Sequence, residues 1–237
     1  MKFINKNKKG KGYIELLKIH KNKDTSYKED VQDDKSKNTT IRTDVLQSLL
    51  EEQGFLCAYC MRKIAIRSAT IEHITGQKYI DEKGIEVGKQ KDTDYNNMLA
   101  VCKGIFCQSD LHCDKSRAKY QNKRAVLFIS PLKEQQMKNI KFSQSGVIYY
   151  KEPIEKIDEE NETLKDKEIR YDLNKVLNLN CENLREDREK VLKIVKKSLI
   201  KYKFDKKVIL KELDYWKQNN HYKEFCQVAI YELEKYI

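Results

Sequence analysis

Apolar residues recur at helical spacing at two places in the chain. Residues 39–54 predict a helix, because four apolar side chains share one face and a glycine follows the last turn. These residues are Val45, Leu46, Leu49, Leu50 and Gly54. A longer helix is predicted after Asn180, its expected N-cap, with apolar residues on one face at Leu184, Val191, Leu192, Val195 and Leu199. Two more helices are predicted over KKVILKELDYW and YKEFCQVAIYELEKYI.

Between these helical regions the pattern changes. RAVLFIS (124–130) and KFSQSGVIYY (141–150) predict strands, the second with a Ser-Gly turn, and 155–168 predicts a connector or the start of a helix. Residues 57–120 have little apolar periodicity and contain most of the cysteines, as is typical of a segment folded around a metal. The expected fold class is α+β, mainly helical. The expected parts are a basic, loosely packed arm (1–38) with a short helix at 13–20, a core domain (39–123), a β-hairpin with connector (124–170) and a helical region (171–237).

Charge adds a class of partner to this picture. The formal net charge is +11, and 36% of the residues are charged while only 39% are hydrophobic. Such an excess favours a polyanion such as nucleic acid, although a generally lysine-rich composition would also produce it. There is no apolar run long enough to span a membrane and no secretion signal at the start, so a cytoplasmic protein without a membrane partner is expected.

The seven cysteines suggest a metal site, because disulfides are rare in a reducing cytoplasm. CAYC (57–60) could be a redox pair, but the βαβ setting of such pairs is missing. Three more cysteines follow about forty residues later, a spacing that suits a four-thiolate structural zinc site. Cys57, Cys60 and Cys102 can be completed by either Cys113 or Cys107, and the residues alone do not separate these choices. Cys181 and Cys226 lie in helical patterns and are expected to be buried thiols.

With IEHI (71–74), DYNNMLAVC (94–102) and LHCDKSR (111–117), the cysteines form an ordered set. It resembles the HNH endonuclease superfamily, whose core is a ββα-metal fold, here in a variant with four cysteines on zinc. The resemblance spans roughly residues 55–118. The corresponding residues are Cys57, Cys60, Glu72, His73, Asn97, Cys102, Cys113, Asp114 and Arg117.

The resemblance implies a role for each residue. His73 would be the general base, since an imidazole with an ordinary pKa near 6.5 can accept a proton at neutral pH. Glu72 and Asp114 would hold Mg²⁺ or another divalent cation, which keeps most of its waters and needs few protein oxygens. Asn97 would brace the loop beside His73, and Arg117 would contact the phosphate. The structural zinc would hold these positions together.

Three features qualify this assignment. Glu72, Asp114 and Arg117 replace the residues that are commoner at their positions in the superfamily. His112 is a rival for the third position of the HNH signature. Neighbouring side chains of a flat strand point to opposite faces, so Glu72 and His73 need a bend or a strand end nearby, which Thr75-Gly76 could supply.

The resemblance is closest to the HNH nucleases of prokaryotic anti-phage defence, of the Septu and retron-associated type. It implies an ATPase partner related to ABC and SMC proteins, which the C-terminal helices could bind. DNA is the expected substrate, and an RNA such as tRNA is the alternative. A zinc-stabilised module that binds nucleic acid without cutting it is the competing interpretation.

Overall fold

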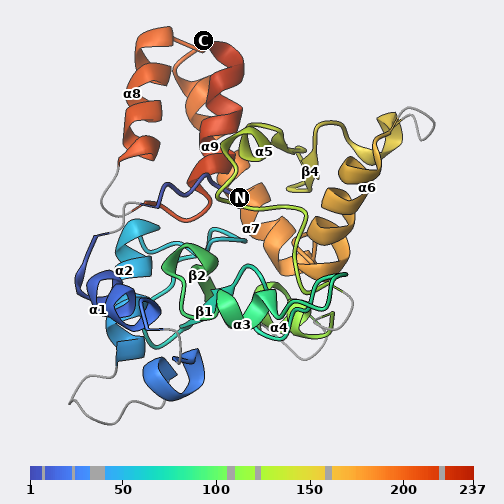
Figure 1. Ribbon diagram of the computed structural model, residues 1–237. Helices are drawn as coiled ribbons and strands as arrows, with labels where there is room; N and C mark the ends of the chain where they lie inside the picture. The colour runs from blue at the N-terminus through green and yellow to red at the C-terminus, as the bar shows by residue number, and fades with distance from the viewer. Residues whose placement is uncertain are drawn as a thin grey trace.

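The computed structural model describes residues 1–6, 9–22, 25–32, 41–105, 110–120, 124–157, 162–218 and 222–237. The fold is α+β and about half helical, with two small antiparallel sheets (Figure 1). The α-helices are α1 Lys11–His20, α2 Ile41–Glu52, α3 Val87–Gln90, α4 Cys113–Ala118, α5 Glu134–Lys138, α6 Leu164–Tyr171, α7 Glu182–Lys201, α8 Lys206–Lys217 and α9 Cys226–Leu233. The strands are β1 Ala69–His73, β2 Met98–Cys102, β3 Ile140–Phe142 and β4 Ile148–Tyr150. Short π and 3₁₀ turns are η1 Tyr27–Gln32, η2 Tyr95–Asn97, η3 Ile154–Lys156, η4 Asp172–Val176 and η5 Glu234–Tyr236.

The N-terminal segment is packed against the core, so the prediction of a loose arm was wrong for its described part. Helix α1 confirms the short helix expected at 13–20, and it crosses α2 closely. A Cβ on Gly12 would lie 2.1 Å from the Asp44 carbonyl oxygen, so only glycine permits this approach. Leu16, Tyr27 and Val31 are buried in the main core because α1 and η1 cover it.

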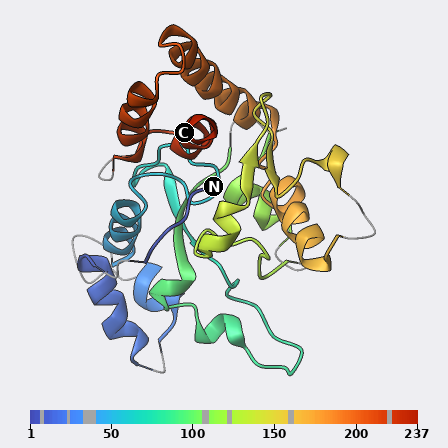
Figure 2. The ribbon, with the colours of Figure 1, turned by 90° about the horizontal axis from the view of Figure 1, so that it is seen from above.

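Strands β1 and β2 form an antiparallel pair in which Ala69 lies opposite Cys102 and His73 lies opposite Met98. Helix α4 packs against β2. The segment between the two strands, which includes α3, projects from the body of the molecule (Figure 2). This arrangement places the end of β1 and the start of α4 next to one another.

A second hairpin, β3–β4, forms within 141–150 and one residue before it, where the Ser-Gly turn was predicted. The apolar run 124–130 is not a strand; only Val126 makes an isolated bridge, to Thr75. Side chains satisfy its backbone instead. Asp172 accepts from the amides of Phe128 and Ile129, and Gln136 accepts from the Ser130 amide.

The three predicted C-terminal helices are confirmed as α7, α8 and α9. The N-cap of α7 is Cys181 rather than Asn180. The side-chain amide of Asn180 instead bonds Ile148 of β4: its Oδ1 accepts from the Ile148 amide and its Nδ2 donates to the Ile148 carbonyl. The residue before α9 returns to the CAYC turn, where the Phe225 amide donates to the Met61 carbonyl over 3.1 Å. None of the described helices has the length and apolar character needed to cross a membrane.

Candidate metal centre and active site

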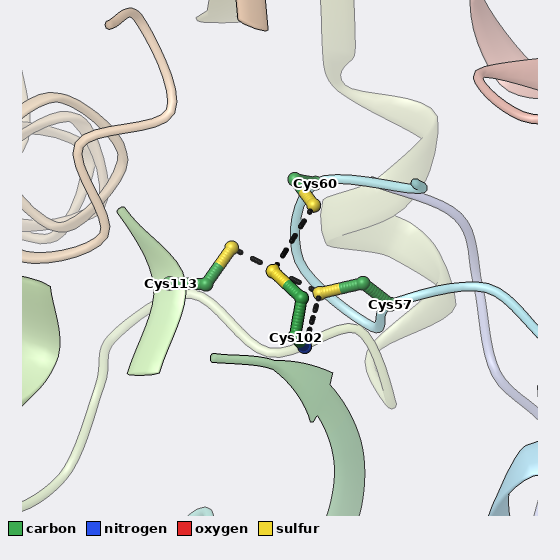
Figure 3. A group of neighbouring side chains, drawn as sticks. All are labelled: Cys57, Cys60, Cys102 and Cys113. Atoms are coloured by element: carbon green, nitrogen blue, oxygen red, sulfur yellow. Dashed lines mark hydrogen bonds between the residues drawn. The ribbon is translucent and has the colours of Figure 1, made fainter. Parts of the chain in front are cut away.

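Four cysteines meet at one point between β2, α4 and the CAYC turn (Figure 3). The sulfurs of Cys57, Cys60, Cys102 and Cys113 all lie within 4.8 Å of one another, with 3.9 Å between Cys57 and Cys113 and 3.7 Å between Cys60 and Cys102. Thiolates about 2.3 Å from a tetrahedral zinc ion lie about 3.8 Å apart. A disulfide would need sulfurs at about 2 Å. The cluster therefore has the dimensions of a four-thiolate metal site, and Cys113 rather than Cys107 is its fourth described member; Cys107 lies outside the described residues.

The backbone brings the two halves of this cluster together by specific contacts. The Cys102 amide donates to the Cys57 sulfur over 3.3 Å. The loop after Cys102 closes where the His112 amide donates to the Gly104 carbonyl. A Cβ on Gly104 would lie 1.6 Å from the His112 carbonyl oxygen, so the glycine is needed for the loop to return to Cys113.

The thiols of the cluster perturb one another. Burial raises the pKa of Cys113, and hydrogen bonds from its neighbours add to the rise. Burial acts in the same direction on Cys60, but hydrogen bonds from the other thiols hold the pKa of Cys60 well below its ordinary value. Four buried thiolates repel one another unless a cation binds them, so this donor set suits a divalent metal. His112 lies here, with Nδ1 3.2 Å from the Cys113 sulfur, rather than beside His73.

His73 ends β1 with its ring buried and its orientation held. Its Nε2 lies 2.8 Å from the Asp92 carbonyl oxygen. A carbonyl only accepts hydrogen bonds, so Nε2 carries the proton, and the neutral ring has its lone pair on Nδ1. Burial lowers the pKa of His73 below 6.5, although the bond to Asp92 opposes this effect. The ring is therefore neutral at pH 7, with one basic nitrogen.

Glu72 points to the other face of β1, toward α4. Its carboxylate pairs with Arg117, which is itself 4% exposed. Arg117 also donates to the Tyr59 hydroxyl and to the carbonyls of His73 and Ile74. The guanidinium thus supports the end of β1, and the predicted phosphate contact would require it to leave some of these partners.

Asp114 lies in the first turn of α4, within electrostatic range of Glu72. Burial raises the pKa of Glu72 to about 7, the Arg117 charge opposes the rise, and the Asp114 charge adds to it. Burial also raises the pKa of Asp114. The two carboxyl groups share one electrostatic environment, but among the described residues only the four cysteines form a group of three or more ligands within metal-binding distance.

Asn97, the last residue of η2, ties the segment after β1 to the segment before β2. Its Oδ1 accepts from the Thr75 amide over 2.8 Å. Its Nδ2 donates to the Thr75 and Lys91 carbonyls over 3.1 and 3.0 Å. Lys91 precedes Asp92, whose carbonyl bonds His73. The buried Asn97 side chain therefore braces the segment that orients His73.

Replacing Asn97 with alanine is expected to destabilise the fold by at least about 2 kcal/mol, since each buried backbone group left unpaired costs about 1–3 kcal/mol. Urea unfolding monitored by circular dichroism measures the change. Asn96→Ala is the matched control, because Asn96 is exposed and bonds only its neighbour Asp94. Equal unfolding midpoints for the two variants would contradict the bracing role.

Three residues of the site were not identified from sequence. Asp92 orients His73, Tyr27 packs edge-on against the His73 ring at 4.7 Å between centroids, and Tyr59 contacts Arg117. Tyr59 had a signal, because it lies between two metal ligands. Tyr27 and Asp92 had none, because they meet His73 only through tertiary packing.

No protein-family model matches the chain, and no curated protein matches it.

Proposed function

We propose that this chain is a metal-dependent endonuclease of the HNH superfamily that hydrolyses phosphodiester bonds of nucleic acid. The observation that carries the proposal is the tautomer imposed on His73. The Asp92 carbonyl accepts a hydrogen bond from the protonated Nε2, which leaves Nδ1 as a base at the end of a strand. The pairing of β1 with β2, followed by α4, supports a ββα-metal core around this residue.

In this proposal His73 removes a proton from the attacking water through Nδ1. Its lowered pKa keeps it unprotonated and ready to accept that proton at pH 7. The carboxylate oxygens of Glu72 and Asp114 would hold Mg²⁺ or a similar cation. Its charge would stabilise the negative charge that develops on the phosphate during hydrolysis. Zinc at the four cysteines would have a structural role. By binding Cys113 it would fix the position of Asp114, the next residue of α4.

Magnesium affinity is expected to fall about tenfold between pH 8 and pH 6, because binding to Glu72 requires its ionised form and its pKa is about 7. Below this pKa a proton must leave before the cation binds, so affinity decreases as pH falls. Isothermal calorimetry in buffers of different ionisation enthalpy measures both the affinity and the proton release. In Glu72→Gln, proton release at this residue is lost; an unchanged release would exclude Glu72 as a ligand.

The substrate is proposed to be DNA, with RNA as the alternative, and the net charge of +11 supports a polyanion of either kind. An ATPase partner and a role in anti-phage defence rest on the sequence resemblance, and co-purification tests the partner. Plasmid DNA and bulk RNA incubated with the protein and Mg²⁺ test the nuclease proposal, wild type beside His73→Ala.

A second candidate is a zinc-stabilised module that binds nucleic acid without cutting it. The specific observation in its favour is the burial of His73, which is 8% exposed beneath Tyr27. A binding module has no need for an oriented base, so binding would be the same in His73→Ala and neither protein would cut. The fixed tautomer favours the nuclease.

A further inference from the structure

A pocket of about 480 Å³ opens where the chain leaves α4 and meets α6. Its lining residues are Tyr120, Arg124, Lys167, Glu168 and Tyr171. Its volume falls in the range of about 300–1,000 Å³ that is usual for small-molecule sites. None of these residues has a role in the proposed hydrolysis.

The pocket is connected to the candidate active site through the backbone. The Tyr120 amide donates to the Arg117 carbonyl over 2.8 Å, and the Arg117 guanidinium donates to the Ala125 carbonyl over 3.2 Å. Arg117 also pairs with Glu72. A strand bound with its phosphate at a cation held by Glu72 and Asp114 would lie along α4, and Tyr120 of the pocket directly follows this helix.

Two tyrosines form its aromatic walls. The rings of Tyr120 and Tyr171 are perpendicular, with 6.3 Å between their centroids. Tyr171 is 44% exposed, so a ligand can reach it beside the Arg124 guanidinium. A planar ring that stacks on one tyrosine would present its edge to the other, a geometry that aromatic pairs favour.

Arg124 is fixed at the base of this pocket. Its guanidinium carbon lies 5.0 Å from the Tyr171 ring and 5.1 Å from the Phe128 ring. It pairs with Glu168, and its Nε lies 3.3 Å from Asp172, which is fully buried. These contacts hold a donor and an acceptor, Arg124 and Glu168, in set positions beside the aromatic walls.

The charge balance separates two kinds of ligand. Arg124 and Lys167 are offset by Glu168 and Asp172, so the pocket has no excess positive charge to attract a phosphate. Aromatic faces with paired polar groups instead match a nucleobase, which stacks through its face and forms hydrogen bonds at its edge. A base within a duplex is already stacked and paired, so only an unpaired base can enter.

We propose that the pocket between Tyr120 and Tyr171 binds an unpaired nucleobase of the nucleic acid that the adjacent site acts on. This inference rests on the proposed function and narrows its substrate to strands with an unpaired nucleotide near the cleavage point. Duplex DNA without such a nucleotide is then a poorer substrate than a single strand or a loop.

The test is binding of short single-stranded oligonucleotides that contain one 2-aminopurine, whose fluorescence is quenched when it stacks. All proteins have the His73→Ala background to prevent cutting. Tyr171→Leu removes the stacking face, and Tyr171→Phe keeps it. Tyr202→Leu is a remote control, because Tyr202 is also 44% exposed and lies at the end of α7.

Tyr171→Leu is expected to weaken single-strand binding about tenfold and to remove the quenching, as the loss of one stacked base predicts. Tyr171→Phe and Tyr202→Leu should retain both, and duplex binding should change little in any variant. Single-strand affinity and quenching that are unchanged in Tyr171→Leu, or no single-strand binding by the parent protein, would overturn the proposal.

The outcome is separable from the nuclease proposal. Cutting by the wild-type protein together with Tyr171-independent binding would contradict the pocket proposal and support the nuclease proposal. Tyr171-dependent binding by a protein that cuts nothing would support the pocket as a nucleobase site and contradict the nuclease proposal.

Discussion

Replacing His73 with alanine is expected to lower the cleavage rate of the proposed nuclease by about 10²–10⁴-fold, the usual contribution of a general base. The variant loses Nδ1, the basic nitrogen that the bond from Nε2 to Asp92 leaves unprotonated. The four-cysteine cluster should be unaffected, because His73 lies outside it. Nicking of supercoiled plasmid and degradation of bulk RNA, each followed over time with Mg²⁺, measure the rate.

The alanine variant also leaves the Asp92 carbonyl without its donor, so a folding defect must be separated from lost chemistry. His73→Gln supplies an amide donor but no base, and it should be as inactive as His73→Ala while retaining more stability. Zinc content and thermal unfolding are measured on both. Full activity in His73→Gln would assign the catalytic proton transfer to another group.

Replacing Cys113 with serine is expected to release the metal and to prevent native folding of the region around β1, β2 and α4. Structural zinc contributes about 10–16 kcal/mol in small zinc domains, which is as large as the total stability of most proteins, about 5–15 kcal/mol. Cys113 is fully buried and is central to this cluster. Metal analysis by mass spectrometry and circular dichroism measure the two effects.

Cys226→Ala is the matched control, since Cys226 is equally buried but lies outside the cluster. It should keep one zinc per chain and lose on the order of 1 kcal/mol for the small volume removed. Cys107→Ser should also keep the metal. Zinc retained in Cys113→Ser and lost in Cys107→Ser would reverse the choice of the fourth ligand.

The spacing of apolar residues correctly predicted the helices whose structure depends mainly on their own side chains. The apolar faces of α2 and α7 are regular, and both helices form where their periodicity places them. The run 124–130 is as apolar as a strand, but Asp172 of η4 and Gln136 of α5 satisfy its backbone groups with their side chains. A short apolar run contains no information about such partners, which is why this strand prediction was wrong.

The sequence likewise predicted the residue types of the candidate site but not the tertiary contacts that arrange them. The spacing of the cysteines indicated a metal site, but the choice between Cys107 and Cys113 depended on the closure of the loop at Gly104. The order of Glu72 and His73 predicted their types of chemistry. Strand β1 ends at His73 rather than at Thr75-Gly76, and the two side chains have different partners, Arg117 for Glu72 and Asp92 for His73. The burial of Arg117 was not predictable, because its partners come from three separate segments.

The bond between Phe225 and Met61 has a consequence for how the chain is made. A ribosome that adds about 5–20 residues per second needs roughly 8–33 s to proceed from residue 61 to residue 225. During that interval the Met61 carbonyl beside the CAYC turn lacks the Phe225 amide that donates to it. Nascent chains therefore complete the surroundings of this turn only after residue 225 has been added.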